Sequence, residues 1–276
     1  MRCGVVIPVR GFAPFLAEAV ESVLAEGPAA VVVVDDASPE PLALHPDHAA
    51  HVRLLRLERS AGPGNARAEG EARLPREIEA VALCDADDAW TPGSLAPRLQ
   101  VLRGAAWCCG AARVVGADGL PTGEAWPAAA TTLPGLYVRN GVCTSSVVLR
   151  REALAAAGGL HGGVPPAEDW DLWLRLAAGG ARGVALDEVV VRYRRHPGAL
   201  THDVAALARA QRAAHERHGH LVDARTRRAA LRRDDAALAG GLARAGDLRG
   251  AVRAALRGRA LRPVLAGLRR RDPYRR

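Results

Sequence analysis

Apolar residues in the first hundred positions follow two alternating patterns. Short continuous apolar runs predict buried strands, and apolar positions spaced three and four residues apart predict amphipathic helices. The strands are expected over residues 3–9, 29–36, 52–57 and 80–85. The helices are expected after them, from the apolar pattern that begins at Phe12 and ends near Gly27, then over 64–74 and 92–103. This order predicts a largely parallel sheet with helices on both faces.

In the second half of the chain, the sequence signals for the ends of helices and strands are weaker. Residues 116–141 contain three prolines and few periodic apolar positions, which predicts a loop acting as a lid or as part of a pocket. A strand and a short helix are expected over 143–160, and a helix with an acidic start over 168–179. Beyond residue 200 the chain consists of Ala- and Arg-rich segments that predict packed helices with solvated Arg faces.

Length and composition indicate a folded globular protein. The chain has 276 residues, of which 49% are hydrophobic, enough for one large domain or two small ones. Its five cysteines are an odd number without a C-x-x-C spacing, so we expect neither a disulfide framework nor a zinc site, and a reducing cytosol fits best. The opening "RCGVVIPVRGF" predicts a first strand and not a signal peptide. A run of about 18 apolar residues, as a membrane span needs, does not occur in the sequence.

Charge is concentrated at one end of the chain. All 38 basic residues are Arg, which together with the abundant Ala, Gly and Pro is typical of a GC-rich bacterial genome. Residues 201–276 hold 19 Arg against 7 acidic residues, a net charge of +12, which leaves −4 for residues 1–200 because the whole chain carries +8. The expected basic surface therefore lies in the C-terminal region.

Two acidic clusters follow predicted strands. One ends "VVVVDD" with Asp35 and Asp36, and the other is "CDADD" with Asp85, Asp87 and Asp88. Since ligands of parallel sheets bind outside the carboxyl ends of the strands, both clusters should converge on one crevice. Crowded carboxylates repel one another unless a cation or hydrogen-bond donors lie among them, and oxygen ligands suit Mg²⁺ or Mn²⁺. The alternative is that the second cluster only caps the helix after Pro92.

Glycine-rich phosphate loops are missing from the sequence. A G-x-G-x-x-G does not follow the first strand, and a G-x-x-x-x-G-K-[ST] occurs nowhere. Dinucleotide redox chemistry and P-loop phosphate binding are therefore disfavoured. A metal held by the second acidic cluster could instead neutralise the charge of a departing diphosphate.

Seven segments, in this order, resemble the family 2 glycosyltransferases of the GT-A fold. They are "VVIPVRG", "VVVVDDASPE", "RSAGPGNARAEG", "LCDADDAW", "TSSVVLRREALAAAGGL", "EDWDLWLRL" and "YRRHPGALT", within roughly residues 3–200. The chain departs from the family pattern at Ala68, where Asn is frequent, and at "VRG" in the first loop, where "YN" is commoner. The departures concern the identity of the donor sugar.

The resemblance implies a fold and a division of the chain. The fold is an α/β, Rossmann-like mixed and mostly parallel sheet flanked by helices, with a C-terminal helical appendage. Residues 1–200 would form the glycosyltransferase domain, with a nucleotide-sugar half over 1–115 and an acceptor half over 116–200. Residues 201–276 would form the Arg- and Ala-rich helical region.

The resemblance also assigns donor and metal residues. Asp36 would read the N3–H of a uracil or thymine, a donor that cytosine lacks. The residue types alone leave a structural alternative to each of three assignments: Asp36 is a turn residue, Arg67 is exposed on a helix, and His196 lies on the surface. The residues assigned to the nucleotide sugar are Pro8, Val9, Asp36, Arg67, Asp85 and Asp87, and those assigned to the metal are Asp87, Asp88 and His196.

The segment "EDWDLWLRL" combines an acidic helix start with an apolar face. Negative side chains there complement the helix dipole, which is the alternative to a catalytic role. By resemblance, Asp169 is the general base that takes a proton from the acceptor hydroxyl in a single inverting displacement. Glu168 and Trp170 would lie on the acceptor side.

The expected function is a metal-dependent inverting transfer of a sugar from a UDP- or dTDP-sugar to a hydroxyl acceptor. The alternative is a binding protein, either a sugar-nucleotide sensor or a nucleic-acid binder that uses its Arg-rich tail. The acidic crevice and the few Tyr and Phe residues disfavour nucleic acid. We expect a cytoplasmic protein, and the basic amphipathic helices of the tail also suit an anionic membrane surface at the inner face of the membrane.

Overall fold

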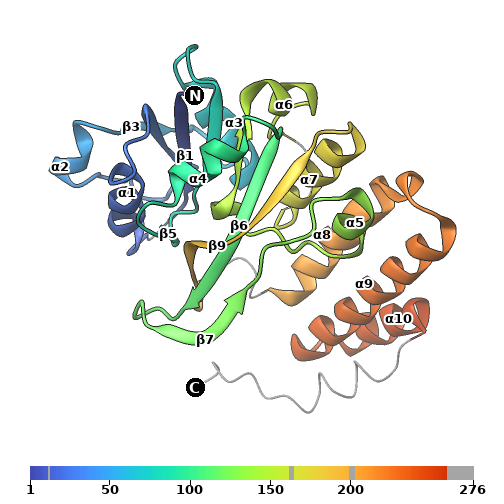
Figure 1. The fold of residues 1–276 in the computed structure, drawn as a ribbon. Coiled ribbons are helices and arrows are strands. Elements are labelled where there is room, and N and C mark those ends of the chain that lie inside the picture. The colour runs from blue at the N-terminus through green and yellow to red at the C-terminus, as the bar shows by residue number, and fades with distance from the viewer. Residues whose placement is uncertain (12, 162–164, 199–202, 260–276) are drawn as a thin grey trace. The chain divides into compact units, whose positions relative to one another are not determined.

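A nine-stranded sheet forms the centre of the first of two units into which the chain divides (Figure 1). The structure is a computed structural model that describes residues 1–11, 13–161, 165–198 and 203–259. The first unit comprises Met1–Gly162 with Leu172–Arg195, and the second comprises Gly163–Asp171 with His196–Arg276.

The strand order in the sheet is β3-β2-β1-β4-β8-β6-β9-β5, and β7 pairs with β6 outside this order. Strands β1 to β4 are parallel to one another, and β9 is parallel to β6. The pairs β4–β8, β6–β8, β6–β7 and β5–β9 are antiparallel, so the predicted mixed α/β fold is confirmed. The strands are β1 Cys3–Val9, β2 Ala30–Asp35, β3 Arg53–Arg56, β4 Ala80–Leu83, β5 Ala89–Trp90, β6 Trp107–Val115, β7 Pro121–Trp126, β8 Val148–Arg150 and β9 Gly183–Arg194.

Helices cover the two faces of the sheet according to the alternation of side chains along the strands. Val5 and Ile7 of β1 belong to the apolar cluster that contains Val20 of α1, whereas Val6 points to α3. The helices of this unit are α1 Leu16–Leu24, α2 Pro46–Ala49, α3 Pro63–Ala72, α4 Leu95–Val101, α5 Leu133–Val138, α6 Arg151–Ala156 and the part of α7 Glu168–Ala178 from Leu172 onward.

Helix α3 approaches the sheet so closely that one position accepts only glycine. A Cβ atom at Gly70 would lie 2.5 Å from Cγ1 of Val6 and 2.8 Å from Cγ2 of Val34. These distances are below any normal van der Waals contact, and therefore the backbone of α3 at Gly70 lies directly against these two valine side chains of β1 and β2.

The predicted elements of the first hundred residues are present, with shorter bounds. Helix α1 begins at Leu16, after the predicted first turn, and Phe12 of its apolar pattern lies outside the described residues. Helix α4 covers Leu95–Val101 where 92–103 was predicted. The prediction of a plain loop over 116–141 is wrong: this segment contains β7 and α5. The segment shows no apolar alternation at β7 because β7 is an edge strand whose side chains are mostly exposed.

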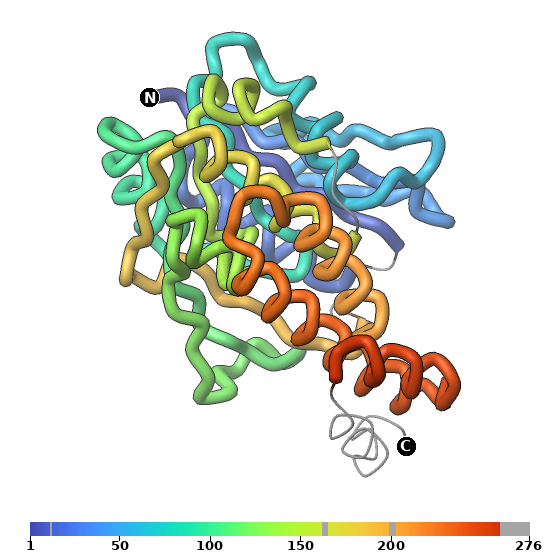
Figure 2. The backbone as a smooth tube through the Cα atoms, turned by 90° about the vertical axis from the view of Figure 1, so that its right-hand side faces the viewer, coloured from blue at the N-terminus to red at the C-terminus, as the bar shows by residue number. Residues whose placement is uncertain are grey.

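The second unit contains three consecutive helices that pack side by side (Figure 2). They are α8 Val204–Arg217, α9 Ala224–Arg244 and α10 Leu248–Gly258. Each begins at an Asp whose carboxylate accepts backbone N–H bonds of the first turn, namely Asp203, Asp223 and Asp247. Alanine dominates the apolar core between them, which is Ala205, Ala208, Leu238, Ala239, Leu242, Ala243, Ala251, Ala254 and Ala255.

All five cysteines are free and buried. Burial raises the pKa of Cys3 and of Cys108 to about 12 and that of Cys109 to about 11, and it raises the pKa of Cys84 and Cys143 well above the ordinary value. The nucleophilic thiolate is therefore scarce at neutral pH.

We expect the native protein to leave all five thiols unreacted with a disulfide reagent at pH 8. Raising the pH to about 9 should change this little, because the thiol pKa values lie higher still and the side chains are buried. Absorbance titration should then find five thiols after unfolding in guanidinium chloride. A fast-reacting thiol in the native protein would contradict the burial of these side chains.

Candidate active site

The carboxyl ends of β1, β2 and β4 meet at one edge of the sheet. Parallel pairing places Val9 beside Asp35 and Val6 beside Leu83. Crevices that bind ligands form at such edges of parallel sheets. Pro8 and Val9 are both buried at the end of β1, and the Val9 carbonyl accepts a bond from the N–H of Asp36 at 2.8 Å.

Asp35 and Asp36 have separate partners at this edge. Asp35 is 1% exposed and accepts bonds from the Arg56 guanidinium and the Ser38 N–H, each at 2.8 Å. It therefore has a structural role in the turn. Asp36 is 3% exposed, and its carboxylate accepts bonds from Ser60 Oγ, Ala61 N–H and Gly62 N–H at 2.8–3.0 Å.

The Asp36 contacts hold the segment that leads into α3. A carboxylate offers about four lone-pair sites, so three protein donors leave room for one further hydrogen bond. The prediction that Asp36 contacts a nucleobase stays a prediction, and the geometry defines which site of the carboxylate it would use.

Arg67 on α3 reaches the second acidic cluster. Its Nη2 donates to Oδ1 of Asp85 at 2.6 Å, and the Arg67 side chain is 7% exposed while that of Asp85 is 30% exposed. The alternative of an exposed helical Arg is therefore wrong. A guanidinium at this distance offsets one negative charge of the cluster, so that Asp85 tolerates its neighbours.

Asp88 is the most buried member of the cluster and is held by two donors. Its Oδ2 accepts a bond from Ser145 Oγ at 2.6 Å, and its Oδ1 accepts one from the N–H of Arg194 at 2.9 Å. Ser145 Oγ also accepts a bond from the N–H of Asp85 at 2.9 Å. A single hydroxyl thus links the two ends of the segment Asp85–Asp88. Ser145 lies in the quoted "TSS" motif, but sequence reasoning did not assign it a role.

The environment of Asp88 disfavours its charged form. Burial raises the pKa of its carboxyl group well above the ordinary value, and the charges of Asp87 and Asp85 raise it further. The bonds from Ser145 and Arg194 act in the opposite direction. Asp88 is therefore less available to a cation than the half-buried Asp87, and its assignment as a metal ligand stays a prediction.

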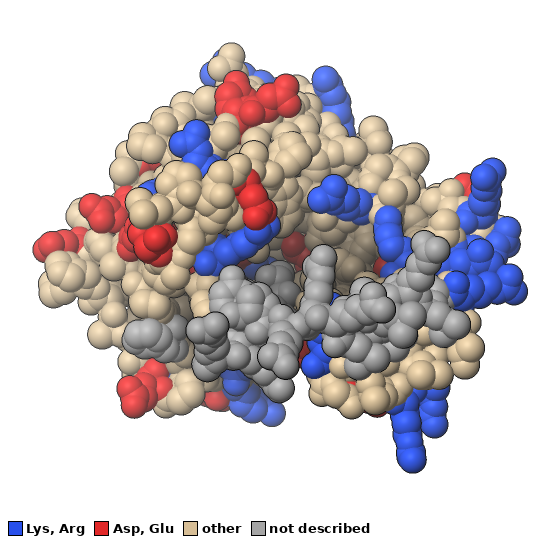
Figure 3. Space-filling view, turned by 90° about the horizontal axis from the view of Figure 1, so that it is seen from below, with Lys and Arg blue, Asp and Glu red and all other residues tan. Residues whose placement is uncertain are grey.

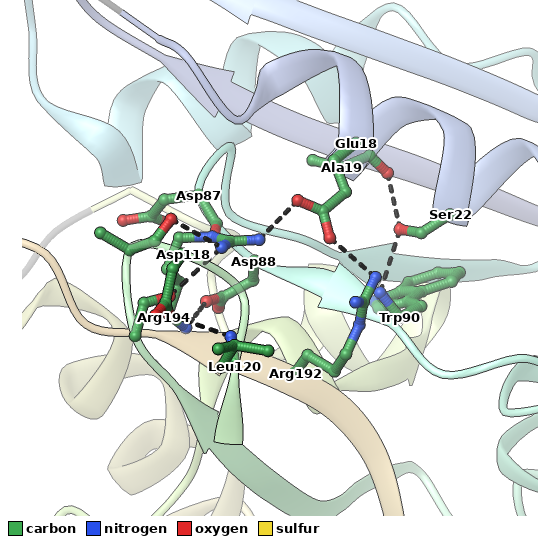
Figure 4. A network of polar contacts seen from close by, with 12 residues as sticks. Glu18, Ala19, Ser22, Asp87, Asp88, Trp90, Asp118, Leu120, Arg192 and Arg194 are labelled. Atoms are coloured by element: carbon green, nitrogen blue, oxygen red, sulfur yellow. Dashed lines mark hydrogen bonds and ion pairs between the residues drawn. The ribbon is translucent and has the colours of Figure 1, made fainter. Parts of the chain in front are cut away.

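Arg194, at the end of β9, joins this cluster to α1 and to the segment after β6 (Figure 4). Its Nε donates to the Asp87 carbonyl at 3.0 Å, and its Nη2 donates to Oε2 of Glu18 at 2.5 Å. The guanidinium also lies 4.3 Å from the centre of the Phe15 ring. The first Arg of the quoted "YRRH" gave no sign of this role, because its partners are distant in the sequence.

The donor set fits a hard divalent cation that a substrate helps to hold. Among the described residues, no three His, Cys, Asp or Glu side chains come close enough together to hold a metal ion. Mg²⁺ and Mn²⁺ in nucleotide enzymes are bound by one or two carboxylates together with phosphate oxygens, so such a cage is not required. Asp87 is half-buried, and its carbonyl accepts a bond from Nε of Arg194 at 3.0 Å.

The first turn of α7 belongs to the second unit and carries the predicted base. The N–H of Trp170 donates to Oδ1 of Asp169 at 2.6 Å, and Asp169 is half-buried. Glu168 is 6% exposed. Asp171 is 1% exposed and contacts Nε2 of His218 at 2.8 Å and Nη1 of Arg217 at 3.0 Å.

A second Asp–His pair lies beneath this turn. The Trp170 ring meets the His215 ring edge to face at 4.6 Å between centroids. His215 is fully buried, and its Nδ1 lies 2.5 Å from Oδ2 of Asp234 on α9. The sequence predicted packed helices with solvated Arg faces in this region and assigned no role to Asp234 and Asp235, which are both buried. His196, the third predicted metal ligand, is half-buried and follows the end of β9.

Comparison with known protein families and sequences gives one family and one relative. The model of the family described as glycosyl transferase family 2 matches residues 4–154. The succinoglycan biosynthesis protein ExoW of Rhizobium meliloti (strain 1021) is 34% identical over 93 residues, which are 32% of this chain. The matched part is 29% of the length of ExoW.

Solved structures share the fold at low sequence identity. S. aureus TarS 1-349 in complex with UDP-GlcNAc matches with a TM-score of 0.60 and 16% identity, over 94% of this chain and 93% of that one. The mannosyltransferase PcManGT from Pyrobaculum calidifontis, in complex with GDP-Man and Mn²⁺, matches with a TM-score of 0.60 and 18% identity, over 97% and 78% of the two chains.

Proposed function

Because the family model covers more than half of its residues, the chain belongs to glycosyl transferase family 2, and we propose that it moves a sugar from a nucleoside diphosphate to a hydroxyl acceptor. The observation that carries the proposal is the set of polar side chains at the carboxyl ends of β2 and β4. Asp36, Arg67, Asp85 and Asp87 all lie within the matched residues. Glycosyl transfer needs such groups to bind a base, a ribose and a diphosphate.

We propose a UDP- or dTDP-sugar as the donor. The remaining acceptor site of Asp36 would take the N3–H of the base, while Pro8 and Val9 provide an apolar wall. Arg67, fixed by Asp85, would lie near the base or the diphosphate, and Asp85 near the ribose. TarS, a relative in fold, was solved with UDP-GlcNAc, which supports a uridine donor without naming the sugar for this chain.

We propose that the diphosphate binds together with Mg²⁺ or Mn²⁺ through Asp87. When bound, the cation neutralises the charge that develops on the leaving diphosphate. Asp87 would hold it, and Asp88 and His196 are the further ligands that the sequence predicts. PcManGT was solved with Mn²⁺, which supports a divalent metal at the corresponding fold.

Replacing Asp87 with Ala should abolish the metal-dependent part of nucleotide binding. Without this carboxylate the cation loses its protein ligand, and the diphosphate then faces Asp85 and Asp88 unscreened. Calorimetric titration with UDP and dTDP, in Mn²⁺ and in EDTA, measures this part directly. Asp187→Ala, which removes an exposed carboxylate from β9, is the matched control. Equal affinities in Mn²⁺ and EDTA for the unchanged protein would reject the metal assignment.

We propose Asp169 as the general base of an inverting, single-displacement reaction. An acceptor hydroxyl is a weak nucleophile until its proton is removed, and a carboxylate opposite the leaving group can take that proton. Asp169 is the acid of the first turn of α7 that is half-buried, whereas Asp171 is engaged by His218 and Arg217. Glu168 and Trp170 would line the acceptor side.

Asp169→Asn should lower turnover by about 10² to 10⁴ while donor affinity and fold are kept, because the amide cannot take up a proton at neutral pH. A panel of UDP- and dTDP-sugars is first screened for metal-dependent hydrolysis, with water as the acceptor, and the best donor is used for both variants. Glu168→Gln, which removes one charge from the neighbouring position, should cost much less. Near-normal hydrolysis by Asp169→Asn with normal donor binding would remove Asp169 from the mechanism.

A non-catalytic sugar-nucleotide-binding protein is the alternative to an enzyme, and a nucleic-acid binder is a further one. Donor binding without hydrolysis or transfer for any sugar of the panel would favour the sensor. The carboxylates of the site disfavour a polyanionic partner, because unpaired like charges repel.

Helix α10 presents its larger apolar side chains to solvent. Leu248, Val252 and Leu256 are 51%, 46% and 66% exposed and recur every four residues, so they form one stripe. An Arg follows each of them in the sequence, and the buried positions of the helix are Ala and Gly. Exposed Arg side chains gather on the right of Figure 3, where α9 and α10 lie in Figure 1.

We propose that this apolar and basic stripe contacts an anionic membrane surface. None of the described helices is long and apolar enough to cross a membrane. Contact through α10 would place the protein at the inner face of the membrane as a peripheral protein.

Leu256→Glu should lower binding to phosphatidylserine-containing vesicles at least about tenfold at low salt, since it removes a large apolar group and adds a repelled charge. Vesicle sedimentation of the full chain measures the effect. Leu54→Glu, at an exposed position on β3, is the matched control and should bind as the unchanged protein does. Failure of the unchanged protein to bind such vesicles would exclude the membrane contact.

A further inference from the structure

The two residues that follow the proposed base are both anchored by the C-terminal end of α8. The ring of Trp170 meets the ring of His215 edge to face, with 4.6 Å between the centroids. The carboxylate of Asp171 lies 2.8 Å from Nε2 of His218, the residue that ends α8. Positions 215 and 218 are neighbours on one side of a helix, so α8 holds both residues with the same face.

Helix α9 supports the first of these contacts. Nδ1 of His215 lies 2.5 Å from Oδ2 of Asp234, and both side chains are buried. A carboxylate bonded to one ring nitrogen fixes the orientation of an imidazole. The division of the chain agrees with these contacts, because Gly163–Asp171 belongs to the same unit as His196–Arg276. The first turn of α7 is therefore a structural part of the C-terminal helical unit.

Asp171 depends on its partners because its carboxylate is removed from water. The side chain is 1% exposed, and a buried carboxylate costs several kcal/mol unless it is paired. Its Oδ1 accepts bonds from Nη1 of Arg217 at 3.0 Å and from Nε2 of His218 at 2.8 Å. The side chain of Arg217 is long and 52% exposed, whereas that of His218 is a short ring and 6% exposed. His218 is therefore the partner that fixes the position of Asp171.

The helical spacing places this anchor and the proposed base on different sides of the turn. Asp169 and Asp171 both lie in α7, which begins at Glu168. Residues two apart on an α-helix are separated by about 200° around the axis, so the two carboxylates point to nearly opposite sides. An anchor on one side of a short turn thus sets the direction of the side chain on the other.

We propose that His218 is a positioning residue for Asp169. Through Asp171 it fixes the turn that carries the base, and the contact of Trp170 with α8 acts in the same way. The inference rests on the proposed function, because it assumes that Asp169 takes the proton of the acceptor. It extends the active site to α8 and α9, to which the sequence motifs assigned no part in it.

The test compares full-length variants at position 218. His218→Leu removes the ring donor, while Arg217 still pairs with Asp171, so the variant is expected to fold. His218→Gln places an amide nitrogen near the position of Nε2 and restores a donor. His220→Leu, at an exposed position two residues further along, is the matched control. Turnover is measured as metal-dependent hydrolysis of the best donor, calorimetry gives the donor affinity, and thermal unfolding reports the fold.

His218→Leu should lower turnover about 10- to 100-fold with unchanged donor affinity, because a displacement of about 1 Å costs up to about 10²-fold in rate. His218→Gln should recover most of the turnover, and His220→Leu should match the unchanged protein. A role in stability alone would lower the temperature of unfolding and leave the turnover of the folded protein unchanged.

A double variant tests whether His218 acts through the base. Adding His218→Leu to Asp169→Asn should lower turnover little further, because the group that His218 positions has already lost its function. Losses that multiply in the double variant would show that His218 acts independently of Asp169.

The outcomes separate this inference from the proposed function. If Asp169→Asn is slow while folded His218→Leu keeps its turnover, only the role of His218 is rejected, as it is by multiplying losses or by an equal loss in His220→Leu. If Asp169→Asn keeps its turnover, or the unchanged protein hydrolyses no donor, the base assignment fails and the role of His218 fails with it. Should His218→Leu not fold, His218→Asn, whose shorter amide does not reach Asp171, takes its place with the same expected outcomes.

Discussion

Repulsion among the carboxylates that follow β4 is the constraint around which the first unit is arranged. Asp85, Asp87 and Asp88 lie within four consecutive positions, and like charges so close together need hydrogen-bond donors from other parts of the fold. Arg67 from α3, Ser145 from the turn before β8 and the N–H of Arg194 from β9 supply those donors. The conformation of this segment therefore depends on donors from elements that lie far from it in the sequence.

The strands and helices that form this edge of the sheet were predicted well, because the sequence signals for them are local. Apolar runs and three-to-four spacing identified β1, β2, α1 and α3, and parallel order alone brought the two acidic clusters to one edge. Element ends were less accurate, since caps such as Gly62 before α3 depend on backbone angles that propensity does not fix. Residues 116–141 were misjudged because β7 is an exposed edge strand, which lacks the apolar alternation of a buried one.

The partners of the acidic cluster were the part that sequence reasoning missed. Ser145 is 57 residues from Asp88, and Arg194 is 176 residues from Glu18. Pairs so far apart leave no periodic trace in a single sequence. The motifs "TSS" and "YRRH" marked the right segments, but which side chain would point at the cluster follows from the register of β8 and β9 in the finished sheet. Arg67 shows the converse, because a motif position turned out to be a buried ion pair.

The contact of Gly70 with Val6 and Val34 bears on how accurately a donor could be held. Arg67 lies about one turn before Gly70 on α3, where the helix backbone lies directly against the side chains of Val6 and Val34. The two valines are β-branched and stiff at χ1, so the surface against which the backbone of α3 lies has little freedom to shift. Transfer reactions lose rate when reacting groups are displaced by about 1 Å. At this helix, the smallest residue in the chain thus sets the positional tolerance of one of its longest side chains.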